Sequence, residues 1–142
     1  MKKILFTLLL AGCSALQAEG DGLQVTEAYL RLPPPGQKLA AAYFVVSNHA
    51  EVTCHITGAE TSVSTSAEIH EHLHRDGMMK MRPVASLEVA PGERIEFQPG
   101  GYHLMLFGLA EDLAARGKAS LRLLSNCDSA ETAVRLRSLL DE

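Results

Sequence analysis

Turn-forming residues divide this sequence into short pieces, and the division constrains the fold more than any other feature. Three prolines and a glycine occupy residues 33–36, Asp-Gly occupies residues 76–77, and Pro-Gly steps occur at residues 91–92 and 99–100. Proline and glycine at this spacing favour tight turns and exclude long helices. Asp-Gly between two apolar runs is also a strong signal for a β-hairpin.

The pieces between the turns have the length of β-strands. We expect strands at residues 23–32, 40–47, 52–59, 68–74, 78–84, 87–89, 94–97, 101–106, 119–124 and 131–139, and one short helical turn at residues 109–116. Many short strands at near-regular spacing predict an all-β sandwich or barrel. The 142 residues are enough for a single domain with one core, which we place at residues 23–140.

Residues 1–18 are expected to be a secretory signal rather than part of the fold. Lys2 and Lys3 precede an apolar run at residues 4–11 that is too short to span a membrane. The run ends in Leu-Ala-Gly-Cys, which resembles a bacterial lipobox in which Cys13 becomes the lipidated first residue of the mature chain. The alternative is ordinary cleavage after Ala18, which would discard Cys13. On the lipobox interpretation, the protein contacts a membrane only through its lipid anchor.

Charge and cysteine content narrow the possible partners and compartments. The formal net charge is −4 and no basic cluster occurs, which argues against binding to nucleic acid. After Cys13, two cysteines remain, Cys54 and Cys127. An even number of cysteines in an exported chain favours a disulfide. The alternative is two reduced cysteines that act as small buried apolar residues.

Two histidines and two methionines between residues 70 and 105 form a candidate set of metal ligands. Ten residues separate His70 from Met81, twenty-one separate Met81 from His103, and one separates His103 from Met105. Imidazole and thioether are neutral donors, and the soft thioether suits Cu(I), whereas calcium and magnesium require oxygen. On a strand, His103 and Met105 point to one face and the leucines at 104 and 106 to the other.

The sequence around these four residues resembles the periplasmic copper chaperones called PCu(A)C. The similar runs are residues 68–71, 77–84 and 99–105, with further similarity at residues 28–36 and 40–44. The family motif is His, ten residues, Met, twenty-one residues, then His-x-Met, and this sequence reproduces it without a gap. The resemblance implies a cupredoxin-like Greek-key β-sandwich that binds one Cu(I) through His70, Met81, His103 and Met105.

The resemblance also implies a biological setting. PCu(A)C proteins deliver copper to the copper-A centre of cytochrome oxidase, so the implied partners are cytochrome c oxidase subunit II or a Sco-type copper protein. The implied location is the periplasm of a Gram-negative bacterium, and we expect a monomer. Two alternatives stay open: a copper-buffering or resistance protein without a dedicated partner and, less favoured, an electron-transfer cupredoxin, which would need a cysteine thiolate near the His-x-Met strand. No general acid or activated nucleophile is evident, so we do not expect an enzyme.

Neighbouring residues offer further donors. Met79 shares a strand face with Met81 and is the reserve sulfur ligand, while Met78 faces the other way and is interpreted as core. His72 and His74 share a face with His70, and we interpret both as solvated surface residues. As an alternative, they would supply extra nitrogen ligands for Cu(II), which prefers imidazole to thioether.

Overall fold

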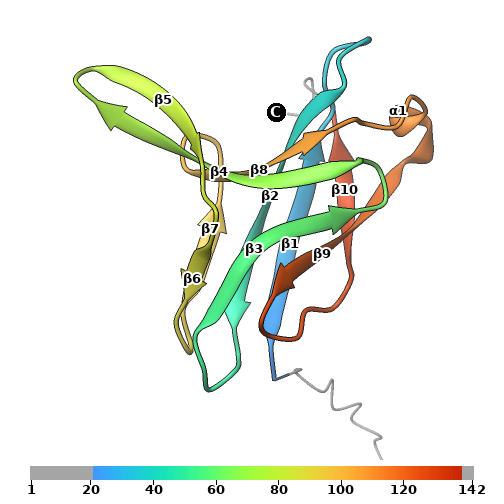
Figure 1. Cartoon of the computed structure of the whole chain (residues 1–142). Coiled ribbons are helices and arrows are strands. Elements are labelled where there is room, and N and C mark those ends of the chain that lie inside the picture. The colour runs from blue at the N-terminus through green and yellow to red at the C-terminus, as the bar shows by residue number, and fades with distance from the viewer. Residues whose placement is uncertain (1–20, 139–142) are drawn as a thin grey trace, which may run out of the picture.

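The structure is a computed structural model that describes residues 21–138. The predicted signal, Cys13 and the end of the last expected strand therefore lie outside the described residues. Within them the chain forms β1 (Leu23–Arg31), β2 (Leu39–Asn48), β3 (Cys54–Thr61), β4 (Ser66–Arg75), β5 (Met78–Pro83), β6 (Leu87–Val89), β7 (Arg94–Phe97), β8 (Tyr102–Phe107), α1 (Leu113–Arg116), β9 (Lys118–Ser125) and β10 (Thr132–Arg137) (Figure 1). The all-β prediction is confirmed, and each expected strand has a counterpart.

The strands form one continuous hydrogen-bonded sheet rather than two separate ones. Their order is β5-β4-β8-β7-β2-β1-β10-β9-β3-β6, and β8 also pairs with β2. The β1–β10 and β7–β8 pairs are parallel, and the other pairs of named strands are antiparallel. The sheet curls over itself, so that β3 and β4 lie close together although they are not hydrogen-bonded neighbours. The core fills the space that this curl encloses.

The core uses alternate residues of the central strands, as expected for a sheet with one face turned inward. Leu104 and Leu106 of β8 are 0% and 1% exposed, and they belong to the same core cluster as Phe44, Val46 and Ile69. The prediction that the two leucines lie in the core is therefore confirmed. Their neighbours on the opposite face of β8 are the candidate ligands His103 and Met105.

The helical turn is shorter than expected, with four residues in place of eight. The backbone N–H of Leu109 donates to the carbonyl of Lys38, and that of Ala110 donates to the carbonyl of Val63. These bonds tie residues 109–110 to two other loops, so the helix begins only at Leu113. No helix within residues 21–138 is long and apolar enough to cross a membrane.

The β4–β5 hairpin projects beyond the body of the sheet (Figure 1). Asp76 and Gly77 have φ of 54° and 74°, and they form a two-residue turn between the paired Arg75 and Met78. Two positive φ values are typical of the hairpin turn that Asp-Gly favours. β4 pairs with β8 only as far as Glu71, whereas its pairing with β5 continues to Arg75.

The projecting half of the hairpin exposes both of its faces. Met78, Met79 and Met81 are 57%, 58% and 54% exposed. The expectation that Met78 lies in the core is therefore wrong. Strand alternation predicts which face of β5 Met78 occupies, but within residues 21–138 no second layer covers this end of the strand.

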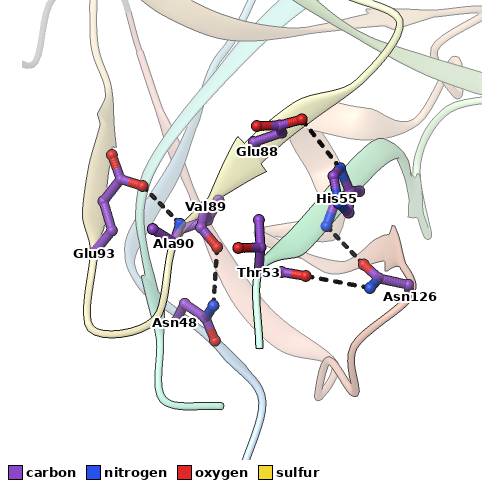
Figure 2. A network of polar contacts seen from close by, with 8 residues as sticks. All are labelled: Asn48, Thr53, His55, Glu88, Val89, Ala90, Glu93 and Asn126. Atoms are coloured by element: carbon purple, nitrogen blue, oxygen red, sulfur yellow. Dashed lines mark hydrogen bonds and ion pairs between the residues drawn. The ribbon is translucent and has the colours of Figure 1, made fainter. Parts of the chain in front are cut away.

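A disulfide and a group of polar contacts fix the loops near Asn48, the last residue of β2. Cys54 and Cys127, the pair favoured by the cysteine count, are joined by a disulfide with their Cα atoms 5.6 Å apart. Beside it, the backbone N–H of His55 donates to Oδ1 of Asn126 over 2.6 Å, and Nδ2 of Asn126 donates to the Thr53 carbonyl over 3.3 Å (Figure 2). The carboxylate of Glu88 lies 3.7 Å from Nδ1 of His55.

Buried Asn48 holds the adjoining loop. Its Nδ2 donates to the carbonyl of Val89 over 2.9 Å (Figure 2). The same Nδ2 donates to the carbonyl of Val52 over 2.8 Å, and Oδ1 accepts from the N–H of Ala50. Asn48 lies seven residues along β2 from Ala41, the cross-strand partner of Met105, which corresponds to about 23 Å of extended strand. These contacts therefore stabilise the fold at a distance from the candidate ligands.

Candidate metal centre

The antiparallel pairing of β4 with β8 brings the candidate ligands together. His70 lies directly opposite His103, and Glu68 lies directly opposite Met105. Residues directly opposite one another in an antiparallel pair project from the same face of the sheet. These four side chains therefore form one patch, while the intervening Leu104 and Ile69 point into the core.

Burial and one hydrogen bond prepare His103 to bind through Nε2. Its side chain is 3% exposed, and its Nδ1 lies 3.2 Å from the Gly101 carbonyl oxygen. A carbonyl can only accept, so Nδ1 carries the proton and Nε2 keeps its lone pair. Burial lowers the pKa of His103, the neighbouring His72 and His70 lower it further, and the bond to Gly101 partly opposes them. The ring is thus held neutral, and within residues 21–138 its buried Nε2 has no hydrogen-bond partner.

His70 is oriented by a carboxylate. Its Nε2 lies 3.0 Å from Oε2 of Glu68, and the carboxylate accepts a hydrogen bond from the ring. The other ring nitrogen, Nδ1, is buried and has no partner among the described residues. A carboxylate that accepts from the far nitrogen of a metal-binding histidine fixes the tautomer of the ring and raises its basicity. His70 therefore has the arrangement of a ligand that binds through Nδ1.

His72 also belongs to this patch. Its ring centroid lies 4.9 Å from that of His103, closer than the 5.8 Å between His70 and His103. Its Nδ1 is buried and, in the described part of the chain, unpartnered. The interpretation of His72 as a solvated surface residue is therefore wrong. Its backbone N–H donates to the Gly101 carbonyl over 3.3 Å, which holds this part of β4 against the start of β8. His74, two residues further on, is exposed as expected.

The two motif methionines have different environments. Met105 is 9% exposed and lies beside His103 on β8, whereas Met81 is 54% exposed on the hairpin. Met81 lies directly opposite His72, and Met79 directly opposite His74. The structure therefore groups His70, His103 and Met105 on two adjacent strands. It places Met81 on the same face of the neighbouring strand, next to His72, with its side chain largely in solvent.

The histidines and acidic residues near this patch do not by themselves form a ready-made metal site. Among residues 21–138, no three His, Cys, Asp or Glu side chains are grouped so that they could hold a metal ion by themselves. A complete site here requires the thioethers or a rotation of the imidazoles. A cavity of about 650 Å³ lies elsewhere, between the proline turn at residues 33–36 and α1, and it contains none of the candidate ligands.

The opposite face of the same strands carries an ion pair. Arg82 donates from Nε to the carboxylate of Glu71, which is the cross-strand neighbour of both Arg82 and Tyr102. Burial raises the pKa of the Tyr102 hydroxyl, and the Glu71 carboxylate raises it further. These three residues stabilise the junction of β5, β4 and β8 from the side away from the imidazoles.

Comparison with known sequences identifies related proteins. A family described as "Putative lipoprotein LpqE-like" matches residues 23–135. A protein of Leifsonia xyli subsp. xyli, "Putative lipoprotein Lxx21020", is 32% identical over 106 residues, which cover 74% of this chain and 63% of that protein. The matched region thus spans less than two thirds of this relative.

Comparison with solved structures identifies the fold as that of PCuAC domains. The copper-bound PCuAC domain from PmoF2 is 18% identical with a TM-score of 0.66, and the match covers 84% of this chain and 94% of that domain. The solution structure of Cu(I)-DR1885 from Deinococcus radiodurans is 25% identical with a TM-score of 0.59, covering 89% of this chain and 87% of that protein. The cupredoxin-like fold implied by the sequence is therefore confirmed.

Proposed function

Since this chain belongs to the LpqE-like family, we propose that it is a copper carrier that acts outside the cytoplasm. It holds one Cu(I) through His70, Met81, His103 and Met105 and passes the ion to a partner protein. It is a carrier rather than an enzyme. The copper bound in the solved PmoF2 and DR1885 structures supports this proposal.

One observation within this chain supports it most strongly. The buried side-chain nitrogen and oxygen atoms of residues 21–138 that lack a hydrogen-bond partner are Nδ1 of His70, Nδ1 of His72 and Nε2 of His103. Buried polar atoms in folded proteins are nearly always hydrogen-bonded, because leaving one unpaired costs about 1–3 kcal/mol. A copper ion bound to His70 and His103 would satisfy two of these nitrogens. Buried ring nitrogens without a hydrogen-bond partner are therefore expected at a metal site and rarely elsewhere.

The donor set suits transport. Two imidazoles and two thioethers are neutral, so the Cu(I) complex keeps its positive charge and no ligand thiolate must be protonated during release. Met105 is buried, whereas Met81 is exposed on a projecting hairpin. An acceptor would therefore displace Met81 first and reach the copper from the hairpin side. The buried His103 and Met105 would be the last ligands to leave.

The disulfide disfavours the electron-transfer alternative. A blue-copper centre requires a cysteine thiolate beside two histidines. Both described cysteines, Cys54 and Cys127, are joined to each other. Neither is therefore free to supply a thiolate to the copper.

The acceptor we propose is cytochrome c oxidase subunit II or a Sco-type copper protein, which the sequence resemblance implies. A copper-buffering protein would use the same ligands without a dedicated acceptor. Deletion of the gene separates the two functions. Loss of copper from the copper-A centre, restored by the wild-type chain but not by a His103 variant, supports delivery. Normal oxidase with increased copper sensitivity would support buffering instead.

Uptake of Cu(I) tests the proposal in vitro. The chain from residue 19 onward, which includes every strand that the structure describes, is titrated with Cu(I) under reducing conditions against a colorimetric Cu(I) chelator. We expect it to remove one Cu(I) per chain from the chelator. Failure to take up Cu(I), or uptake of several equivalents without a break at one, would contradict the proposed site.

Replacement of Met81 or Met79 by leucine tests which sulfur is the ligand. Met81→Leu preserves volume, and such swaps usually cost less than about 1.5 kcal/mol of stability. It should nevertheless weaken Cu(I) binding by roughly tenfold or more, since even residues that only support ligands commonly contribute that much. Met79→Leu is the matched control, equally exposed on the same strand face. Equal Cu(I) affinities of the two variants would show that the motif spacing selects the wrong sulfur.

The proposed location is the periplasm, with the chain anchored by lipid at Cys13. The lipoprotein descriptions of the matched family and of the Leifsonia relative support an anchor. Cys13→Ala should abolish lipid attachment and leave an unprocessed or soluble chain, as mass spectrometry and membrane fractionation would detect. A wild-type mature chain beginning at Glu19 would show instead that ordinary signal cleavage prevails.

A further inference from the structure

We propose that His72 is a copper ligand and that this third imidazole allows the site to hold Cu(II) as well as Cu(I). The inference rests on the proposed copper-carrying function and extends it to a second oxidation state. The four-residue motif does not include His72. Its assignment comes from its position against His103.

The spacing of the rings fits a shared metal ion. A metal about 2 Å from a ring nitrogen lies about 3 Å from the centre of that ring, so two imidazoles on one ion place their centroids roughly 4–6 Å apart. The His72–His103 distance of 4.9 Å and the His70–His103 distance of 5.8 Å both fall in this range. His103 is therefore close enough to share an ion with either histidine of β4.

The unpaired nitrogens support the same assignment. His72 Nδ1 is buried without a partner among the described residues, as are His70 Nδ1 and His103 Nε2. His72 also lies directly opposite Met81, the motif methionine, whereas His70 lies opposite Pro83. A copper ion bound to Met81 and His103 would thus have His72 as a near neighbour on β4. The three rings do not form a closed cluster, so binding requires rotation of the half-buried His70 and His72 side chains toward the buried His103.

The chemistry of the two oxidation states distinguishes the donors. Cu(II) prefers imidazole nitrogen to thioether sulfur, whereas Cu(I) accepts both. With His72 included, the site offers three imidazoles, and the Glu68 carboxylate bonded to His70 adds negative charge beside them. Three imidazole donors beside a carboxylate suit a divalent ion such as Cu(II). With His70 and His103 alone, Cu(II) would have only two preferred donors.

Electron paramagnetic resonance with CuSO₄ tests the inference on the chain from residue 19 onward. The wild-type spectrum should show hyperfine coupling to three nitrogens. His72→Gln should show coupling to two, with Cu(II) affinity at least about tenfold lower, since even indirect supporting residues commonly contribute that much. His74→Gln is the matched control, because His74 lies on the same strand face but is exposed. It should match the wild type.

A second variant guards against a loss of structure in His72→Gln. His72→Met also removes the imidazole, so its Cu(II) affinity should fall as that of His72→Gln does, while circular dichroism should show the strand content of the wild type in both variants. Equal Cu(II) affinities and equal nitrogen couplings in the wild type and His72→Gln would overturn the inference while leaving the proposed function intact. Failure of the wild type to take up Cu(I) would contradict the proposed function itself.

Discussion

His103→Gln is expected to abolish high-affinity Cu(I) binding while leaving a folded protein. His103 is 3% exposed, its Nδ1 is fixed by the Gly101 carbonyl, and its Nε2 is free of hydrogen bonds within residues 21–138. It is also the ring that contacts both His70 and His72. Both close contacts between imidazole rings in the patch therefore involve His103. Any pair of neighbouring imidazoles that binds copper includes this residue. We expect a loss of at least about a hundredfold in Cu(I) affinity, the upper end for residues that merely support ligands.

Competition for Cu(I) with a chelator measures this effect directly. His49→Gln is the control, because His49 is exposed and its ring is bonded to Gln24, away from the patch. It should bind Cu(I) as the wild type does. Circular dichroism should show the same strand content in all three proteins. Cu(I) affinity within threefold of the wild type in His103→Gln would exclude His103 as a ligand.

Loss of the Cys54–Cys127 disulfide is expected to cause the largest loss of stability. The bridge joins residues 73 apart in sequence, and closing a loop of this length stabilises the fold by about 4 kcal/mol in the chain-entropy model. The bridged residues link the start of β3 to the loop that follows β9. For a domain of this size, such a loss lowers the midpoint of thermal unfolding by on the order of 10–20 °C.

The double variant Cys54→Ala/Cys127→Ala tests this expectation without creating a free thiol. Urea unfolding should show the lower free energy of unfolding, and the Cu(I) affinity of the folded variant should not change. Asn126→Ala is a useful comparison, because it removes hydrogen bonds beside the bridge and keeps the bridge itself. A double variant as stable as the wild type would show that the β3–β9 pairing already fixes this end of the molecule.

The turns and strands could be predicted because their signals are local. Asp76-Gly77 produced the expected hairpin turn, and the alternation along β8 correctly assigned Leu104 and Leu106 to the core. The motif spacing singled out His70 and His103, which the structure places directly opposite each other. The turn and core predictions require only turn chemistry and the period of a strand, whereas the choice of His70 and His103 depends on the motif of the PCu(A)C proteins that the sequence resembles.

The environments of His72 and Met78 could not be predicted in this way. Alternation along a strand assigns a face but not the point at which the neighbouring strand ends. β8 pairs with β4 up to Glu71, and the Gly101 carbonyl accepts from the N–H of His72. This register buries part of the His72 ring against His103. Beyond that point no other element of the described chain covers the hairpin, so Met78 is exposed.

Copper K-edge X-ray absorption on the Cu(I)-loaded chain tests the proposed site most directly. The sample is the chain from residue 19 onward, loaded under reducing conditions with one equivalent of Cu(I). If His70, Met81, His103 and Met105 hold the ion, the spectrum will show both nitrogen and sulfur scatterers around a single copper. A coordination sphere of nitrogen or oxygen alone would contradict the proposed site.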